Sequence, residues 1–99
     1  MPSEGGLVVG VIVWELEVFG SQSLKDKRRV VKSLKERLQN RFHVSAAETR
    51  HQDLWQRAEI AACVVSGEQQ HVNEVLDSMD RLVTGDLRAR VIQSRRSYC

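Results

Sequence analysis

The order in which hydrophobic periodicity changes along the chain constrains its fold more than any other feature. Segment 7–19 is rich in valine and alternates in its second half, which predicts a long strand. Apolar residues at helical spacing follow within 24–42 and again within 68–86. Shorter alternating segments predict three more strands, at 44–50, 58–66 and 87–93. The predicted order is therefore strand, helix, strand, strand, helix, strand.

This order predicts an α+β fold. Right-handed crossovers place both helices on one face of a four-stranded antiparallel sheet, which is the ferredoxin-like βαββαβ arrangement. The first and third strands are then central, in agreement with their apolar composition. A chain of 99 residues forms one domain, which we expect over 7–93, with flexible tails at 1–6 and 94–99.

The first predicted helix carries most of the positive charge. Segment 21–42 holds eight Lys or Arg residues against Asp26 and Glu36, a net charge of +6 in a chain whose total is +2. Four of these cations lie in the first two turns, where each first-turn cation opposes the helix dipole at a cost of about 0.3–1 kcal/mol. Ser23 and Asp26 predict a capping box at its start. The second helix region has a net charge of −4, so the helical face should be electrically divided.

Composition excludes several classes of protein. Cys63 and Cys99 cannot form a disulfide framework, and no signal peptide or membrane span is recognisable, so we expect a cytoplasmic protein without a membrane role. The three histidines and Cys63 lack the spacing of metal ligands, and the glycines match no nucleotide-binding loop. We therefore expect neither a metal nor a cofactor.

Three segments together resemble the YlxP-like family, small bacterial domains of unknown function. They are 23–30 (SLKDKRRV), 42–48 (FHVSAAE) and 52–58 (QDLWQRA). The resemblance covers about 7–91 and implies a ferredoxin-like fold. It also implies a link to RNA, because members are often encoded beside genes for transcription termination, translation initiation and ribosome maturation. No functional residues are established for the family, so none are transferred.

The basic helix has two interpretations. In one, it is a solvated face whose long side chains cover apolar surface. In the other, its N-terminus and cations bind the phosphates of a polyanion without reading sequence. We expect a non-catalytic domain that binds RNA or the ribosome through this helix. The candidate contacts are Lys25, Lys27, Arg28, Arg29, Lys32 and Lys35.

The predicted sheet offers little for base recognition. RNA-binding domains of this topology stack bases on aromatic residues of the central strands. The third strand has no aromatic residue, and Trp14 shares the core-facing parity of Ile12 and Leu16. The acidic residues Glu15 and Glu17 would repel phosphate. We therefore expect RNA on the helix side.

The connection between the second and third strands is a second candidate site. Glu48, His51 and Asp53 could form an acid–base cluster, and Trp55 with Arg57 could stack and pair with a ligand. The alternative, which the sequence favours, is a turn that Asp53 caps, with Trp55 folded over an edge of the core. An enzyme or small-ligand domain thus stays open, although no catalytic residue is assigned.

Self-association is the third class of function. Val9, Val11, Val13 and Val65 would leave an apolar patch on the open sheet face, which favours a homodimer through that face. Such a dimer could dock a protein through Trp55 and the acidic second helix. The alternative is a wet face held by cross-strand ion pairs of five charged residues, namely Glu15, Glu17, Glu59, Arg88 and Arg90.

Overall fold

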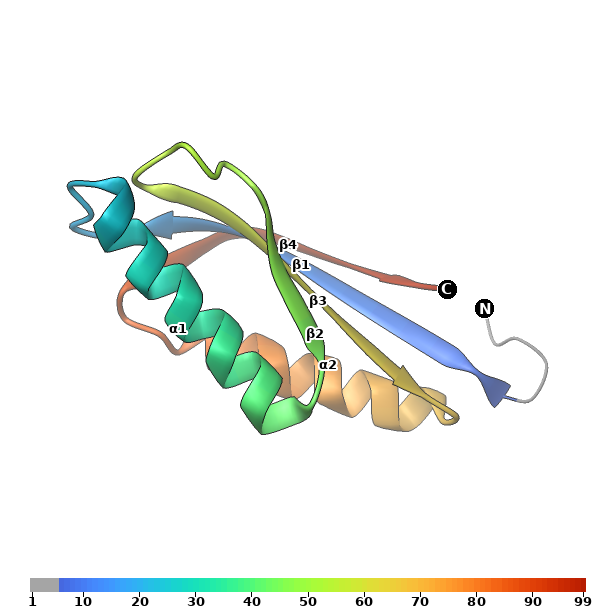
Figure 1. The fold of residues 1–99 in the computed structure, drawn as a ribbon. Helices are drawn as coiled ribbons and strands as arrows, with labels where there is room; N and C mark the ends of the chain where they lie inside the picture. The colour runs from blue at the N-terminus through green and yellow to red at the C-terminus, as the bar shows by residue number, and fades with distance from the viewer. Residues whose placement is uncertain (1–5) are drawn as a thin grey trace.

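The computed structural model describes residues 6–99 and confirms the ferredoxin-like α+β fold (Figure 1). Its elements are β1 (Val8–Val18), α1 (Leu24–Phe42), β2 (Ser45–Arg50), β3 (Arg57–Ser66), α2 (Gln69–Thr84) and β4 (Ala89–Tyr98). The strands lie in the order β2-β3-β1-β4, and every neighbouring pair is antiparallel. Both helices cover one face of the sheet, and β1 and β3 are central, as the sequence predicts.

The alternation of β1 builds the core. Ile12, Trp14 and Leu16 point to the helices and are fully or almost fully buried. The indole Nε1 of Trp14 donates a hydrogen bond to Asp80 Oδ1 on α2 at 2.9 Å, so the one polar atom of this side chain is satisfied. A Cβ atom at Gly10 would overlap Cγ1 of Val72, which shows that this glycine lets α2 approach the sheet closely.

Polar caps fix both ends of α1. Ser23 Oγ accepts the N–H of Asp26 at 3.1 Å, as the predicted capping box requires. The Asp26 carboxylate reaches one residue further back than in a standard box and accepts the N–H of Gln22 at 3.3 Å. At the other end, His43 adopts a left-handed backbone with φ of 54° and stops the helix. The helix thus begins and ends where its local sequence dictates.

The predicted C-terminal tail is wrong, because β4 continues to Tyr98. Tyr98 pairs with Gly10 of β1, and the N–H of Cys99 donates to the carbonyl of Val9 at 2.9 Å. Residues 94–97 are all polar, yet an edge strand is held by backbone hydrogen bonds and needs no apolar side chains. The predicted leader at 1–6 lies, apart from Gly6, outside the described residues.

Within residues 6–99, neither helix combines the length and the apolar character that crossing a bilayer would require.

Candidate functional site

Five cations follow the solvent side of α1, and we call them the basic stripe. At 3.6 residues per turn, Lys25, Arg29 and Lys32 lie opposite Val31, Leu34 and Leu38, the residues that α1 buries against the core, and Arg28 and Lys35 lie on the flank of the helix. Four of the five are exposed, and the fifth, Lys35, is half-buried. With a rise of 1.5 Å per residue, the stripe spans about 15 Å. Its members are Lys25, Arg28, Arg29, Lys32 and Lys35.

The basic stripe is electrostatically uncompensated. Among the residues that the structure describes, none of its five side chains forms an ion pair or a hydrogen bond. The carboxylate of Asp26 is used by the backbone of Gln22, and Glu36 forms no ion pair with any described residue. The charges therefore face solvent as free donors.

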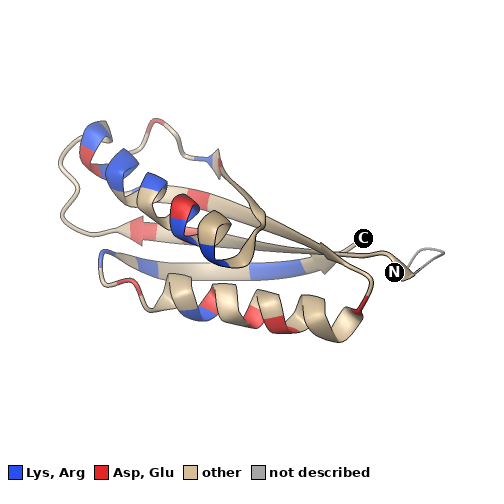
Figure 2. Cartoon of the chain, turned by 60° about the horizontal axis from the view of Figure 1, so that its bottom comes forward, with Lys and Arg blue, Asp and Glu red and all other residues tan. Residues whose placement is uncertain are grey.

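The acidic residues around α2 are mostly engaged. Asp77 Oδ1 accepts a hydrogen bond from Arg96 at 2.8 Å, and Asp80 accepts one from Trp14. Asp86 binds both Arg88 and Arg37, and hydrogen bonds from Arg88 hold the pKa of Asp86 below its ordinary value. Figure 2 shows how the charge of the two helices differs, with blue along α1 and red along α2, while β4 beside α2 also carries blue. The predicted division of charge is therefore present.

Lys27 is a correction to the predicted site. Its side chain is fully buried, with Nζ 2.8 Å from Glu48 Oε2 and 2.8 Å from the carbonyl of His51. The carbonyl oxygens of Gln52 and Arg57 lie 3.3 Å from the same nitrogen. Lys27 therefore cannot contact a nucleic acid.

The helical spacing of the sequence already indicates that Lys27 is buried. Lys27 precedes Val31 by four residues and Leu34 by seven, so it shares the apolar face of α1 rather than the charged one.

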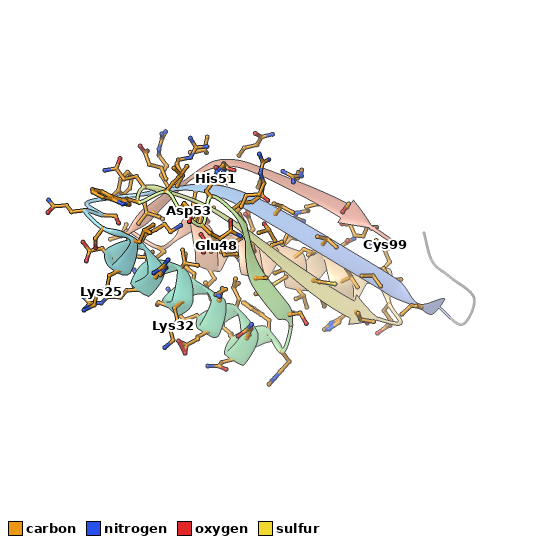
Figure 3. All side chains as sticks on the ribbon, turned by 45° about the horizontal axis from the view of Figure 1, so that its top comes forward. Lys25, Lys32, Glu48, His51, Asp53 and Cys99 are labelled. Carbon is orange, nitrogen blue, oxygen red and sulfur yellow. The ribbon has the colours of Figure 1, made fainter. Side chains whose placement is uncertain are left out.

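The acid–base cluster predicted in the β2–β3 connection is not assembled. Glu48 is bound by Lys27, and His51 Nε2 lies 2.9 Å from Glu15 Oε2 on β1. Asp53 is exposed and makes no side-chain hydrogen bond within the described chain, although Figure 3 shows it near the other two. In residues 6–99, no three His, Cys, Asp or Glu side chains gather as metal ligands.

Glu15 of β1 binds both His51 and Arg57, and the sequence did not predict this contact. Arg57 donates to its Oε2 from Nη2 at 2.6 Å and from Nε at 3.1 Å. Burial acts to raise the pKa of Glu15, but hydrogen bonds and charge from Arg57 and His51 outweigh it, and the pKa lies below its ordinary value. The register of β1 and β3 brings Glu15 and Arg57 together. It pairs Arg57 with Glu17, and Glu15 lies two residues before Glu17 on the same face of the sheet.

The open sheet face has a charged half and an apolar half. In the charged half, cross-strand ion pairs join Glu17 to Arg90 at 2.9 Å and Glu59 to Arg95 at 3.7 Å. Arg88 takes no part in a cross-strand pair and binds Asp86. In the other half, Val65 is 61% exposed beside a hollow of about 230 Å³. The hollow is lined by Val11, Ser45, Ala46, Ala47, Ala61, Ala62 and Cys63.

Trp55 lies at the tip of the β2–β3 connection. The indole is 52% exposed, so the expectation that it folds over an edge of the core is wrong. The N–H of Leu54 donates to the carbonyl of His51 at 3.0 Å and closes the turn without help from the Asp53 side chain. Arg57 pairs with Glu15 and is not available to assist Trp55.

Comparison with known proteins places the chain among uncharacterised relatives. The family model described as "Protein of unknown function (DUF503)" matches residues 9–96. The uncharacterised protein YlxP of Bacillus subtilis (strain 168) is 39% identical over 59 residues, which is 60% of this chain. That alignment spans 64% of the length of YlxP.

Solved structures share the fold at low sequence identity. The structural-genomics protein YJCS has a TM-score of 0.53 and is 12% identical, over 90% of this chain and 96% of its own. The Bacillus subtilis protein YXEP, a dinuclear metal binding peptidase from the M20 family, has a TM-score of 0.52 and is 16% identical. This second match covers 94% of this chain but 25% of YXEP. These likenesses concern the fold alone.

Replacing Lys27 tests its structural role. Lys27→Met would leave Glu48 and the loop carbonyls without their cation, and we expect a loss of about 3–5 kcal/mol in the free energy of unfolding by urea. The neighbouring Lys25→Met, which removes an exposed cation, should change it by less than about 0.5 kcal/mol. Equal stability of the two variants would contradict the role assigned to Lys27.

Glu15 should make stability depend on pH. Because its pKa is lower in the folded state than the ordinary value of 4.5, its carboxylate stabilises the fold above its unfolded-state pKa. That contribution is lost as pH falls through the folded-state pKa. Urea unfolding should show Glu15→Gln less stable than the unmodified protein at neutral pH, with the difference shrinking below about pH 4. Glu17→Gln serves as the exposed control, and a Glu15→Gln difference that stays constant into acid would refute the assignment.

Proposed function

This chain belongs to the DUF503 family, and we propose that it is a non-catalytic domain that binds RNA or the ribosome through the basic stripe of α1. The proposal rests on the stripe itself, five cations on the solvent side and flank of α1 that have no internal partner in the described chain. Lys and Arg side chains presented in this way contact phosphate oxygens without reading sequence.

The fold gains nothing from these charges. Lys25 lies in the first turn of α1, where a cation opposes the helix dipole. The structural cation of this helix is Lys27, which is buried, whereas Arg28 and Arg29 beside it face solvent. A row of charges that satisfies no internal acid within the described chain, and whose first member opposes the helix dipole, supports an external anionic partner. The genomic context of YlxP-like proteins favours RNA over DNA.

An enzymatic role for the β2–β3 connection has less support. Glu48 and His51 are each held by another residue, and Asp53 points into solvent without either of them as a partner. A general base needs its proton-accepting atom within reach of a substrate. The carboxylate of Glu48 is instead committed to Lys27.

Substitution of the stripe tests the function. The triple variant Arg28→Gln/Arg29→Gln/Lys32→Gln should bind structured RNA at least about tenfold more weakly in fluorescence anisotropy, because fewer counterions are released when fewer phosphates are neutralised. The slope of log affinity against log salt should fall by about 0.7–0.9 for each phosphate that the variant no longer binds. Thermal unfolding should be nearly unchanged, since none of the three removed side chains forms an ion pair or a hydrogen bond within the described chain.

A matched control removes the same charge elsewhere. Arg41→Gln/Arg81→Gln/Arg90→Gln changes three exposed arginines that lie outside the stripe. It should keep the affinity of the unmodified protein within about threefold, because only nonspecific attraction is reduced. If both triple variants weaken binding equally, net charge rather than the stripe is responsible and the proposal fails.

Self-association through the apolar half of the open face is a separate proposal. Val65 projects beside the hollow formed by small residues of β2 and β3, so a second copy turned by a two-fold axis offers the same projection and hollow in return. Ala61→Arg would fill the hollow with charge and should convert a dimer to a monomer in analytical ultracentrifugation. An unmodified protein that sediments as a monomer at micromolar concentration would exclude this dimer.

A further inference from the structure

Exposed aromatic side chains gather at one end of the molecule. Of the five aromatic residues in the sequence, Trp55 and Phe19 are the most exposed, at 52% and 51%. They lie on adjoining loops, because the N–H of Val18 donates to the carbonyl of Gln56 at 2.9 Å. An apolar tip of this kind on a small domain marks a contact surface.

The loop that carries Trp55 is fastened to the start of the basic helix. Lys27 Nζ donates to the carbonyl of Gln52, which precedes Trp55 in the sequence, and to the carbonyl of Arg57, which follows it, each at 3.3 Å. The side chain of Gln56 donates to the carbonyl of Ser21, just before α1, at 3.4 Å. In Figure 1 the β2–β3 connection lies beside the first turns of α1. The loop that carries the exposed indole is thus fixed against the N-terminal end of α1, the end at which the basic stripe begins.

An exposed indole and a row of cations on one domain indicate which class of partner it binds. Proteins that bind single-stranded nucleic acids pair a positive track for the backbone with aromatic rings on which bases stack. Bases within a duplex already stack on one another, so an exposed ring gains most from unpaired bases. The guanidinium of Arg57 is bound by Glu15, so it leaves the face of the Trp55 indole open to a base.

We propose, as an extension of the RNA-binding function above, that unpaired RNA bases stack on Trp55 while the phosphates follow the basic stripe. The site is therefore selective for single-stranded or looped RNA over a continuous duplex. The sheet takes no part, since Trp14 is fully buried and β3 has no aromatic residue. Phe19 lies on the adjoining loop as a second ring for a neighbouring base.

The two tryptophans allow a direct optical test. Trp14 is fully buried and bound to Asp80, so a base that stacks on an indole quenches the fluorescence of Trp55 alone. Oligouridine of about 12 nucleotides and an RNA duplex of equal length serve as probes. We expect quenching by oligouridine, tighter binding of oligouridine than of duplex, and no quenching in Trp55→Phe, which keeps an aromatic ring.

Affinity separates stacking from simple apolar contact. Trp55→Ala should weaken oligouridine binding about 5- to 150-fold, whereas Trp55→Phe should retain most of it. Leu54→Ala is the matched control, because Leu54 is the adjacent residue and is 48% exposed. It should bind as the unmodified protein does, and circular dichroism should show all three variants folded.

The experiment distinguishes failure of the stacking proposal from failure of the RNA-binding proposal. Unchanged oligouridine affinity in Trp55→Ala, with binding still weakened at least about tenfold in the stripe variant Arg28→Gln/Arg29→Gln/Lys32→Gln, would overturn the stacking proposal and leave the RNA-binding function intact. Trp55 would then fit an anchor for a protein partner. No binding of either RNA by the unmodified protein would overturn both proposals.

Discussion

The buried ammonium of Lys27 is the interaction on which the arrangement of the candidate site depends. Three N–H donors face four oxygens, one from Glu48, two from the backbone of the β2–β3 connection and one from the carbonyl of Arg57 at the start of β3. An uncompensated charge at this depth would be strongly destabilising, so helix, strand and loop must keep their relative positions. Through this one contact, the start of α1 and the loop that carries Trp55 form a single surface.

Neighbouring cations of one helix therefore have opposite roles. The ammonium of Lys27 is buried and bound within the protein, whereas Lys25, Arg28 and Arg29 satisfy no internal acid within the described chain, and Lys25 in the first turn also opposes the helix dipole. The caps from Ser23 and Asp26 offset part of that cost by using N–H groups of Asp26 and Gln22.

Periodicity alone predicted the topology, because alternation in β1 and the stripes of α1 and α2 each require one buried face. Two features escaped it. The polar end of β4 is held by backbone pairing with β1, which side-chain patterns do not report. The bond between Glu15 and His51 joins residues 36 positions apart and depends on strand register, which spacing cannot supply. Lys27, in contrast, could have been recognised from its place on the apolar face of α1.

Photochemical crosslinking in cell extract, followed by identification of the peptides that carry nucleotide adducts, tests the central claim most directly. If RNA binds α1, adducts should form on the segment that holds Lys25 to Lys35 and on the loop with Trp55, and these adducts should disappear when the extract is brought to high salt. Ribosomal subunits or other RNA should accompany the protein at low salt and be released at high salt. Adducts confined to the sheet face of β1 and β3, or none on α1, would contradict it.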